Sequence, residues 1–149
     1  MIKYIFSVII ISTVVLGCKK DRLIDDRSIL IGQWTWDNSY HSYGYCQNQT
    51  WVEILSPTTE DFSFKIEFLK KGRMKLYRDN VVLDSYRIVI KKFELNNTNY
   101  DFSFYLDNDI EKAVTGGITN DTLWIKGKVN LPFETEHGCE NYLNYFVKE

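Results

Sequence analysis

The side chains that could carry chemistry are few and fall mostly in two segments of the chain. Among 149 residues there are two histidines and three cysteines. Both histidines, His41 and His137, lie in the segments 38–61 and 130–139. Two imidazoles can ligate a transition metal or haem, but no clear third ligand accompanies them. We therefore predict solvated loop histidines, with no metal and no cofactor.

Catalytic groups with a meaningful spacing are not evident. No Ser/His/Asp or Cys/His arrangement has a spacing that indicates nucleophilic catalysis. Glu134 and Glu136 lie two residues apart and could act as acid and base, but acidic residues are common in loops. We expect a protein that is not an enzyme.

Aromatic side chains in the first of these segments suit a binding surface. Aromatic rings can stack on sugars or hold an apolar ligand, although more often such residues pack as a lid on their own fold. The candidate ligand-binding residues are Tyr40, His41, Tyr43, Tyr45, Trp51 and His137.

The N-terminal residues have the three parts of an export signal. Lys3 supplies the positive charge, and residues 5–16 are almost entirely apolar. Twelve helical residues reach about 18 Å, well short of the roughly 30 Å hydrocarbon core, which argues against a transmembrane helix. The run Val15-Leu16-Gly17-Cys18 resembles a bacterial lipobox, in which the chain is cleaved before a cysteine that is then lipidated. The sequence predicts a signal peptide over 1–17 and lipid attachment at Cys18; the alternative is an ordinary cleaved signal.

The residues after Cys18 indicate where the mature protein lies. The stretch 18–27 mixes both charges and is typical of a solvated tether. Acyl chains on Cys18 would anchor the protein to a membrane. An acidic run directly after the lipid cysteine directs surface display in some Gram-negative bacteria, but here Lys19 and Lys20 come first. We expect an outer-membrane lipoprotein on the periplasmic face, with surface display as the alternative.

The rest of the chain alternates apolar and polar residues with the period of β-strands. In 62–68 the apolar face is Phe62, Phe64, Ile66 and Phe68, and in the last strand it is Leu143, Tyr145 and Val147. No convincing helix is evident. The predicted strands are 30–37, 62–69, 73–79, 82–91, 99–106, 109–115, 121–129 and 140–148, with a short extra strand at 50–55. The predicted turns are Lys71-Gly72, Asp79-Asn80, Asp107-Asn108-Asp109, Gly116-Gly117 and Asn120-Asp121.

Eight such strands predict an all-β domain over 28–149. Closure into an up-and-down antiparallel barrel removes the exposed sheet edges, and an open β-sandwich is the alternative. A barrel of this size is filled by side chains or holds one small ligand. Alternate loops of such a barrel lie at one end, so 38–61 and 130–139 would share a rim.

Two cysteines fall on this predicted rim. Cys46 and Cys139 form an even pair in an oxidising compartment. The first and last strands are neighbours in a closed barrel, so their adjoining loops can meet. A disulfide between them is our prediction, and two separate thiols are the alternative.

The chain resembles the lipocalin-like lipoproteins of Gram-negative bacteria. The resemblance rests on the lipobox, on Gly32 and Trp34 in the first strand, on short matches along 28–149, and on the C-terminal Tyr145-Phe146-Val147-Lys148. In lipocalins the tryptophan packs across the barrel floor beneath a basic residue of the last strand. The resemblance therefore implies that Trp34 plugs the core and that Lys148 covers its ring.

Charge and composition limit the partners. Lys and Arg number 18 against 20 Asp and Glu, for a net charge of −2, which makes nucleic acid an unlikely partner. We expect a monomeric envelope lipoprotein that binds a small apolar or sugar-like ligand at the barrel mouth. The alternative is a protein-interaction module or inhibitor that uses the aromatic rim. A cavity inside the barrel would favour the first function, and a filled interior the second.

Overall fold

The computed structural model describes residues 22–45, 49–127 and 140–149, and for 42–45, 49–52 and 140–142 it describes the backbone alone. The elements in chain order are a 3-10 helix η1 (Asp25–Leu30), β1 (Gly32–Tyr45), β2 (Gln49–Leu55), α2 (Pro57–Glu60), β3 (Phe64–Leu69), β4 (Arg73–Arg78), β5 (Val81–Asn96), β6 (Asn99–Leu106), β7 (Asp109–Thr119), β8 (Thr122–Gly127) and β9 (Glu140–Lys148).

Eight of the described strands close an antiparallel barrel. From β3 to β9 each strand pairs with its neighbours in sequence. The start of β1 pairs with β3, and β1 also pairs with β9 from Trp34 opposite Lys148 to Tyr43 opposite Glu140. The predicted closed up-and-down barrel is therefore confirmed, and the open sandwich is excluded.

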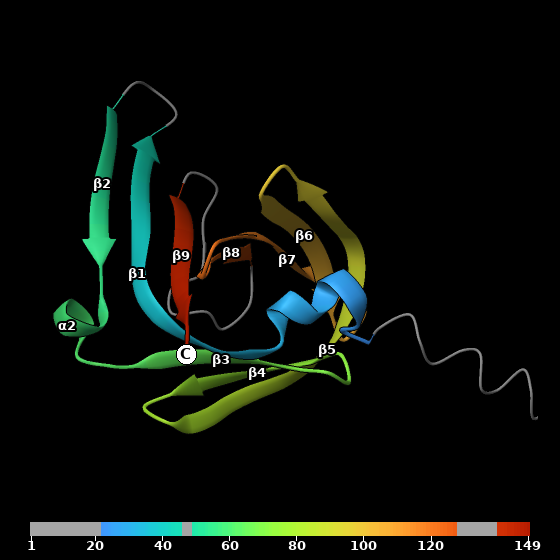
Figure 1. Cartoon of the computed structure of the whole chain (residues 1–149). Helices are drawn as coiled ribbons and strands as arrows, with labels where there is room; N and C mark the ends of the chain where they lie inside the picture. Colours follow the sequence, from blue (N-terminus) through green and yellow to red (C-terminus); the bar gives the residue numbers. More distant parts are fainter. Residues whose placement is uncertain (1–21, 46–48, 128–139) are drawn as a thin grey trace, which may run out of the picture.

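The second strand, β2, lies outside this ring of eight. The later part of β1, from Ser39, pairs with β2 on the side where its first residues pair with β3. A register shift between Trp36 and Asn38 in the β1–β9 ladder marks a bulge, which bends a strand. Figure 1 shows the result, a β1–β2 hairpin that rises beyond β3 and β4.

The prediction of one long loop over 38–61 is wrong, but the short extra strand predicted within it at 50–55 is confirmed as β2. The segment contains the end of β1, all of β2 and the short helix α2. The apolar alternation stops after Trp36 because Ser39 and His41, which are polar, take the buried positions of the strand. The helix α2 begins at Ser56-Pro57 with a capping box, in which Ser56 accepts from the Thr59 N–H and the Thr59 hydroxyl accepts from the Ser56 N–H.

Most hairpin turns lie where the sequence predicts them. Asp79-Asn80 and Asp107-Asn108 have positive φ at both residues, which Asp and Asn tolerate and two-residue hairpins require. The predicted turn at Gly116-Gly117 is wrong, because both glycines are buried inside β7. A Cβ at Gly116 would lie 2.4 Å from the Trp124 carbonyl oxygen and 2.6 Å from the Phe102 ring. These glycines therefore serve close packing rather than a turn.

The barrel interior is filled by large apolar side chains. The bulkiest fully buried ones are Trp34, Trp36, Phe68, Phe104 and Phe146. Rings also pack on each other: Phe102 stacks on Phe104 at 5.5 Å, and Phe68 meets Phe104 edge-on at 6.3 Å. Aromatic pairs of this geometry add to the free energy gained by burial.

One end of the barrel is sealed by η1, Trp34 and Lys148. The indole Nε1 of Trp34 donates to the Leu30 carbonyl at 2.8 Å. The Lys148 ammonium lies 5.1 Å from the centre of the Trp34 ring and donates to the Ile29 carbonyl at 3.0 Å. Gly32 has a φ of +127°, and a Cβ added there would lie 3.6 Å from the Lys148 side chain. Trp34 is fully buried with the Lys148 ammonium over its ring, which is the arrangement that the sequence analysis expects of a core plug and its cover.

The chain packs against the barrel from Leu23 onward, which is closer to the N-terminus than the sequence analysis predicts. Leu23 and Leu30 are fully buried, and the Leu23 N–H donates to the Lys70 carbonyl at 3.2 Å. The predicted tether 18–27 therefore includes residues that are part of the fold, and the expectation of no helix is wrong at η1 and at α2. Two leucines within a charged stretch supply the apolar surface that packs this segment.

Within the described part of the chain, helices are too short or too polar to span a bilayer.

We predict that Trp34→Ala lowers the free energy of unfolding by about 3–5 kcal/mol, because it removes a fully buried ring and leaves a cavity. Lys148→Ala should cost under about 1 kcal/mol, as expected for an exposed cation–π pair. Urea melts of both variants measure this. Ile110→Ala, at a side chain that is 69 % exposed, is the matched control. Equal stability of Trp34→Ala and wild type would contradict the role of the indole as a core plug.

Candidate functional site

The predicted ligand-binding residues do not form one surface. Tyr40 is 41 % exposed, whereas His41 is only 3 % exposed. Successive residues of a strand point to opposite faces, so Tyr40 faces outward and His41 inward. Tyr43 lies in β1 opposite Trp51 of β2, and Tyr45 ends β1, but only their backbone is described. The residues Cys18, Cys46, Glu134, Glu136, His137 and Cys139 lie outside the described residues.

His41 is a buried strand residue rather than the solvated loop histidine that we predicted. Its Nδ1 atom lies 3.9 Å from the Glu53 carboxylate, and Glu53 is its direct cross-strand partner on β2. Glu53 is about half exposed, so this contact sits at the edge of the barrel wall. Among the described residues, no three His, Cys, Asp or Glu side chains come together to hold a metal ion.

The inner face of β1 and β9 next to His41 carries a buried polar network. The Trp36 indole Nε1 donates to the Ser39 hydroxyl at 2.9 Å, and this hydroxyl donates to Asn144 Oδ1 at 2.6 Å. The Asn144 amide in turn donates to the Ile125 carbonyl at 3.5 Å. Hydrogen bonding offsets the cost of burying these groups. The network joins β1, β9 and β8 and serves the fold.

The outer face of the same strands carries an apolar surface that the sequence analysis missed. Ile54, Tyr40 and Leu143 form one row across β2, β1 and β9. Tyr145 and Val147 continue along β9, and Ile54 is 57 % exposed. We call Ile54, Tyr40, Leu143, Tyr145 and Val147 the outer apolar face.

The predicted orientation of the last strand is therefore wrong. Among the described side chains of β9, Asn144 and Phe146 are fully buried, Leu143 and Tyr145 are half-buried, and Val147 is exposed. The alternation in 143–147 was visible in the sequence, but its apolar residues do not face the core. Asn144 takes an inward position because the Ser39 network satisfies its amide.

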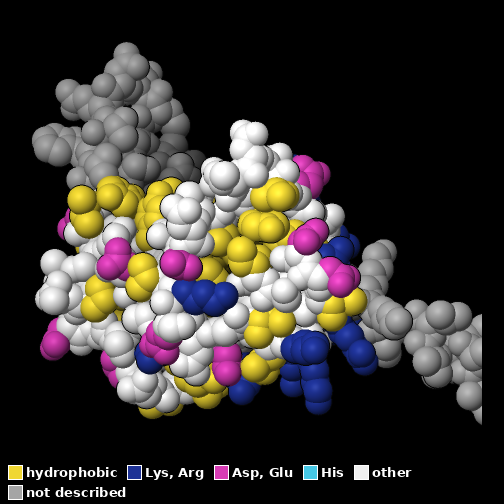
Figure 2. Space-filling view, in the orientation of Figure 1, with side chains coloured by type: hydrophobic (Ala, Val, Ile, Leu, Met, Phe, Trp, Pro, Cys, Tyr) yellow, Lys and Arg dark blue, Asp and Glu magenta, His cyan; other side chains and the backbone are white. Residues whose placement is uncertain are grey.

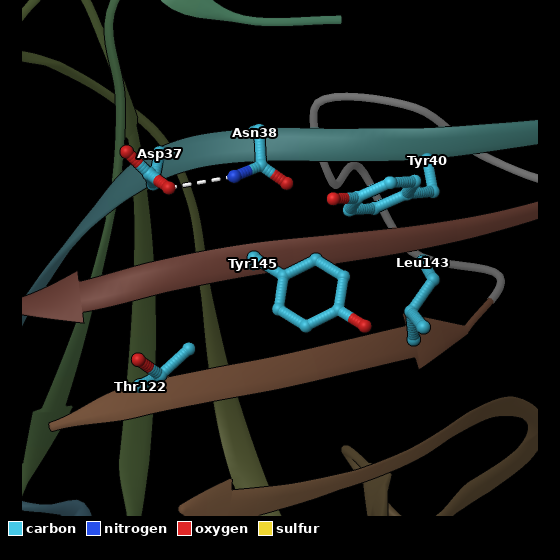
Figure 3. Close-up of a pocket in the computed structure, with 6 residues that line it drawn as sticks. All are labelled: Asp37, Asn38, Tyr40, Thr122, Leu143 and Tyr145. Carbon is cyan, nitrogen blue, oxygen red and sulfur yellow. Dashed lines mark hydrogen bonds between the residues drawn. The ribbon is translucent and has the colours of Figure 1, made fainter. Parts of the chain in front are cut away.

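A shallow groove of about 480 Å³ is hollowed into this surface. Figure 3 shows Asp37, Asn38 and Tyr40 on β1 and Tyr145 and Leu143 on β9, all along one side of the two strands, with Thr122 on β8 beside them. The two tyrosine rings meet edge-on, with centroids 5.4 Å apart.

Polar groups lie at one end of the groove. The Asn38 amide donates to the Asp37 carboxylate at 2.6 Å, the bond drawn in Figure 3. The Asn38 oxygen is buried, and no described residue donates a hydrogen bond to it. Burial raises the pKa of Tyr145 above its ordinary value of 10.0, and the nearby Tyr40 raises this pKa further. The groove thus combines two aromatic rings, one carboxylate and one amide oxygen.

No family model matches this chain, and no curated protein matches it at a significant level. The function is therefore argued from the residues and their geometry.

We predict that Tyr145→Phe makes the stability of the protein less dependent on pH in alkaline solution. A phenol whose pKa is raised in the folded state stabilises the fold below the ordinary pKa of 10.0, and this contribution is lost as pH rises through the folded pKa. Urea melts below and above pH 10 measure the difference. Tyr40→Phe should change the dependence less, because Tyr40 is the smaller cause of the shift. The same alkaline loss in wild type and Tyr145→Phe would contradict the desolvated setting of this phenol.

Proposed function

We propose that this chain is a lipid-anchored protein of the bacterial envelope that acts without catalysis, by docking another envelope protein. The outer apolar face is the observation that carries this proposal. Monomeric soluble proteins rarely expose contiguous apolar patches larger than a few hundred Å², and larger patches mark interaction sites. Tyrosine is enriched at protein interfaces because its ring is apolar and its hydroxyl is polar.

The filled interior supports docking on the outside rather than binding on the inside. Trp34, Trp36, Phe68, Phe104 and Phe146 occupy the barrel and are fully buried. A small ligand inside would need the volume that these rings take. The outer groove offers two tyrosine rings to an apolar side chain of the partner, and the exposed Asp37 carboxylate can accept hydrogen bonds from the partner's donors.

A small sugar-like or apolar molecule in the same groove is the second candidate. A volume of about 480 Å³ is in the range of ligand pockets, and the carboxylate and amide lie beside the two rings. The open shape of the groove would leave much of such a ligand in solvent, and for this reason we favour a protein partner.

The lipocalin-like lipoprotein assignment is part of the same proposal. The closed barrel, the Gly32-x-Trp34 pattern and the Lys148 cover over the Trp34 ring support it. The lipobox at Val15-Leu16-Gly17-Cys18 supports export, lipidation and an outer-membrane location, with the periplasmic face as our choice.

A disulfide between Cys46 and Cys139 also belongs to this proposal. Cys46 directly follows β1 and Cys139 directly precedes β9. Those two strand ends are neighbours, since Tyr43 pairs with Glu140. The register supports a short span between the two thiols, and an oxidising compartment would favour the bond.

We predict that Cys18→Ala releases the protein from the detergent phase into the soluble envelope fraction, because the acyl anchor is lost. Phase partitioning of cell fractions measures the release. The same variant, denatured without reductant, should titrate no thiol if Cys46 and Cys139 are joined. Unchanged partitioning would refute the lipid anchor, and two titratable thiols would refute the disulfide.

We predict that a photo-crosslinking amino acid at position 40 traps one discrete protein adduct in the native host. The same probe at Ile110, an exposed apolar residue outside the outer apolar face, is the matched control and should trap none. Adding Leu143→Asp to the position-40 probe should reduce the adduct about tenfold or more, as for loss of a central interface contact. Gel shifts and mass spectrometry of the adduct read the result.

Three outcomes would contradict the docking proposal. Equal adducts at positions 40 and 110 would show that the contact is not specific. No adduct at position 40, with a small mass retained on the native protein, would favour the second candidate. An adduct with a second copy of this chain would show that the outer apolar face forms a dimer and does not dock a different protein.

A further inference from the structure

The end of the barrel where the described chain begins carries a group of exposed basic side chains. Arg22 is the first described residue, Lys70 and Lys71 form the turn between β3 and β4, and Arg73 begins β4. Arg87 of β5 lies directly opposite Arg73. We call these five residues the basic end.

Backbone contacts hold these residues together. The Leu23 N–H donates to the Lys70 carbonyl at 3.2 Å, which places Arg22 beside the turn. The Ile88 N–H donates to the Gly72 carbonyl at 2.9 Å, which places Arg87 on its other side. In Figure 1 the blue start of the described chain lies beside the β3–β4 turn, and Figure 2 shows Lys and Arg side chains gathered in the same region, at the lower right.

The pairing of two arginines across the sheet does not by itself stabilise the barrel. Arg73 and Arg87 are direct cross-strand partners, and like charges in such positions destabilise a sheet. Some lysines elsewhere on the sheet lie beside carboxylates, as Lys65 does beside Glu149 at 2.6 Å and Lys75 beside Glu67 at 3.6 Å.

Acidic groups near the basic end are fewer. Asp25 and Asp26 are exposed in η1. Asp107 lies beside Arg87, and its carboxylate accepts the Arg87 backbone N–H at 2.8 Å. Among the described residues, the five basic side chains outnumber these three carboxylates, which leaves an excess of positive charge at this end.

Chain length ties the basic end to the lipid anchor. Leu23 is fully buried, so the chain is fixed to the barrel from that residue on. Cys18 precedes Leu23 by five residues, which span at most about 18 Å even when fully extended. A lipid on Cys18 therefore keeps the basic end within this distance of the membrane surface.

We propose that the basic end binds anionic phospholipid headgroups in the leaflet that holds the anchor. This inference rests on the proposed lipid anchor at Cys18 and adds the orientation of the barrel on the membrane. Each Lys or Arg close to an anionic surface strengthens binding about fivefold. The far end of β1 and β2 then points away from the bilayer, and a partner reaches the outer apolar face from the side.

The test uses the mature chain from residue 18 onward with Cys18→Ala, so that neither acylation nor the apolar segment 5–16 contributes to binding. Co-sedimentation with vesicles of phosphatidylcholine, with and without phosphatidylglycerol, measures the partition coefficient at low and high salt. We expect binding that requires phosphatidylglycerol and weakens with salt. Adding Lys70→Gln and Lys71→Gln should lower the partition coefficient about 25-fold. Every variant carries the same N-terminal segment, so differences between variants report the basic end alone.

Two control variants make the test decisive. Lys70→Arg with Lys71→Arg keeps the charge and should bind like the parent. Arg78→Gln with Lys126→Gln removes two charges elsewhere and should change binding by about twofold or less. Parent-like binding of the Lys70→Gln, Lys71→Gln variant, or an equal loss in the Arg78→Gln, Lys126→Gln variant, would overturn the proposal. Cell fractionation of Cys18→Ala tests the anchor separately, so failure of the anchor and failure of the basic end are distinguishable.

Discussion

The pairing of β1 with β9 is the constraint on which the rest of this structure depends. It joins the first strand to the last and leaves neither as an open edge along the paired residues. The same ladder sets Trp34 beneath Lys148 at the sealed end and Tyr40 beside Leu143 on the outside. Core, seal and outer apolar face therefore all follow from one register, and a slip by one residue would exchange the faces of β9.

Local chemistry made most of the fold predictable. Asp79-Asn80 and Asp107-Asn108 were identified as turns because these side chains tolerate positive φ. Strands such as Phe64–Leu69 were identified because every second residue is apolar and buried. The sequence-based prediction fails at positions where a polar residue is buried or an apolar residue is exposed. Ser39, His41 and Asn144 are polar but buried. The hydrogen bond between Ser39 and Asn144 cannot be predicted from the alternation of apolar and polar residues. Gly116 and Gly117 are strand residues because neighbouring groups leave no room for a Cβ.

The candidate site depends on a β-bulge that the sequence pattern does not predict. Without the register shift between Trp36 and Asn38, strict alternation from Trp36 would turn Tyr40 inward and His41 outward. The extra residue reverses this, so Tyr40 faces solvent and His41 is buried. Sequence analysis could therefore name Tyr40 as a binding residue but could not place it beside Tyr145, which it assigned to the core.

The sealed end connects the proposed anchor to the proposed docking surface. A long solvated tether would let the barrel turn freely, and a partner would meet the outer apolar face at any angle. Burial of Leu23 and Leu30 and the Trp34–Leu30 hydrogen bond fix the chain to β1 instead. Because β1 also carries Tyr40, the strand that would be fixed to the proposed anchor also presents the proposed docking face. Contact of the basic end with anionic headgroups would then fix the direction of that face, which reduces the orientational freedom lost when a membrane-bound partner docks.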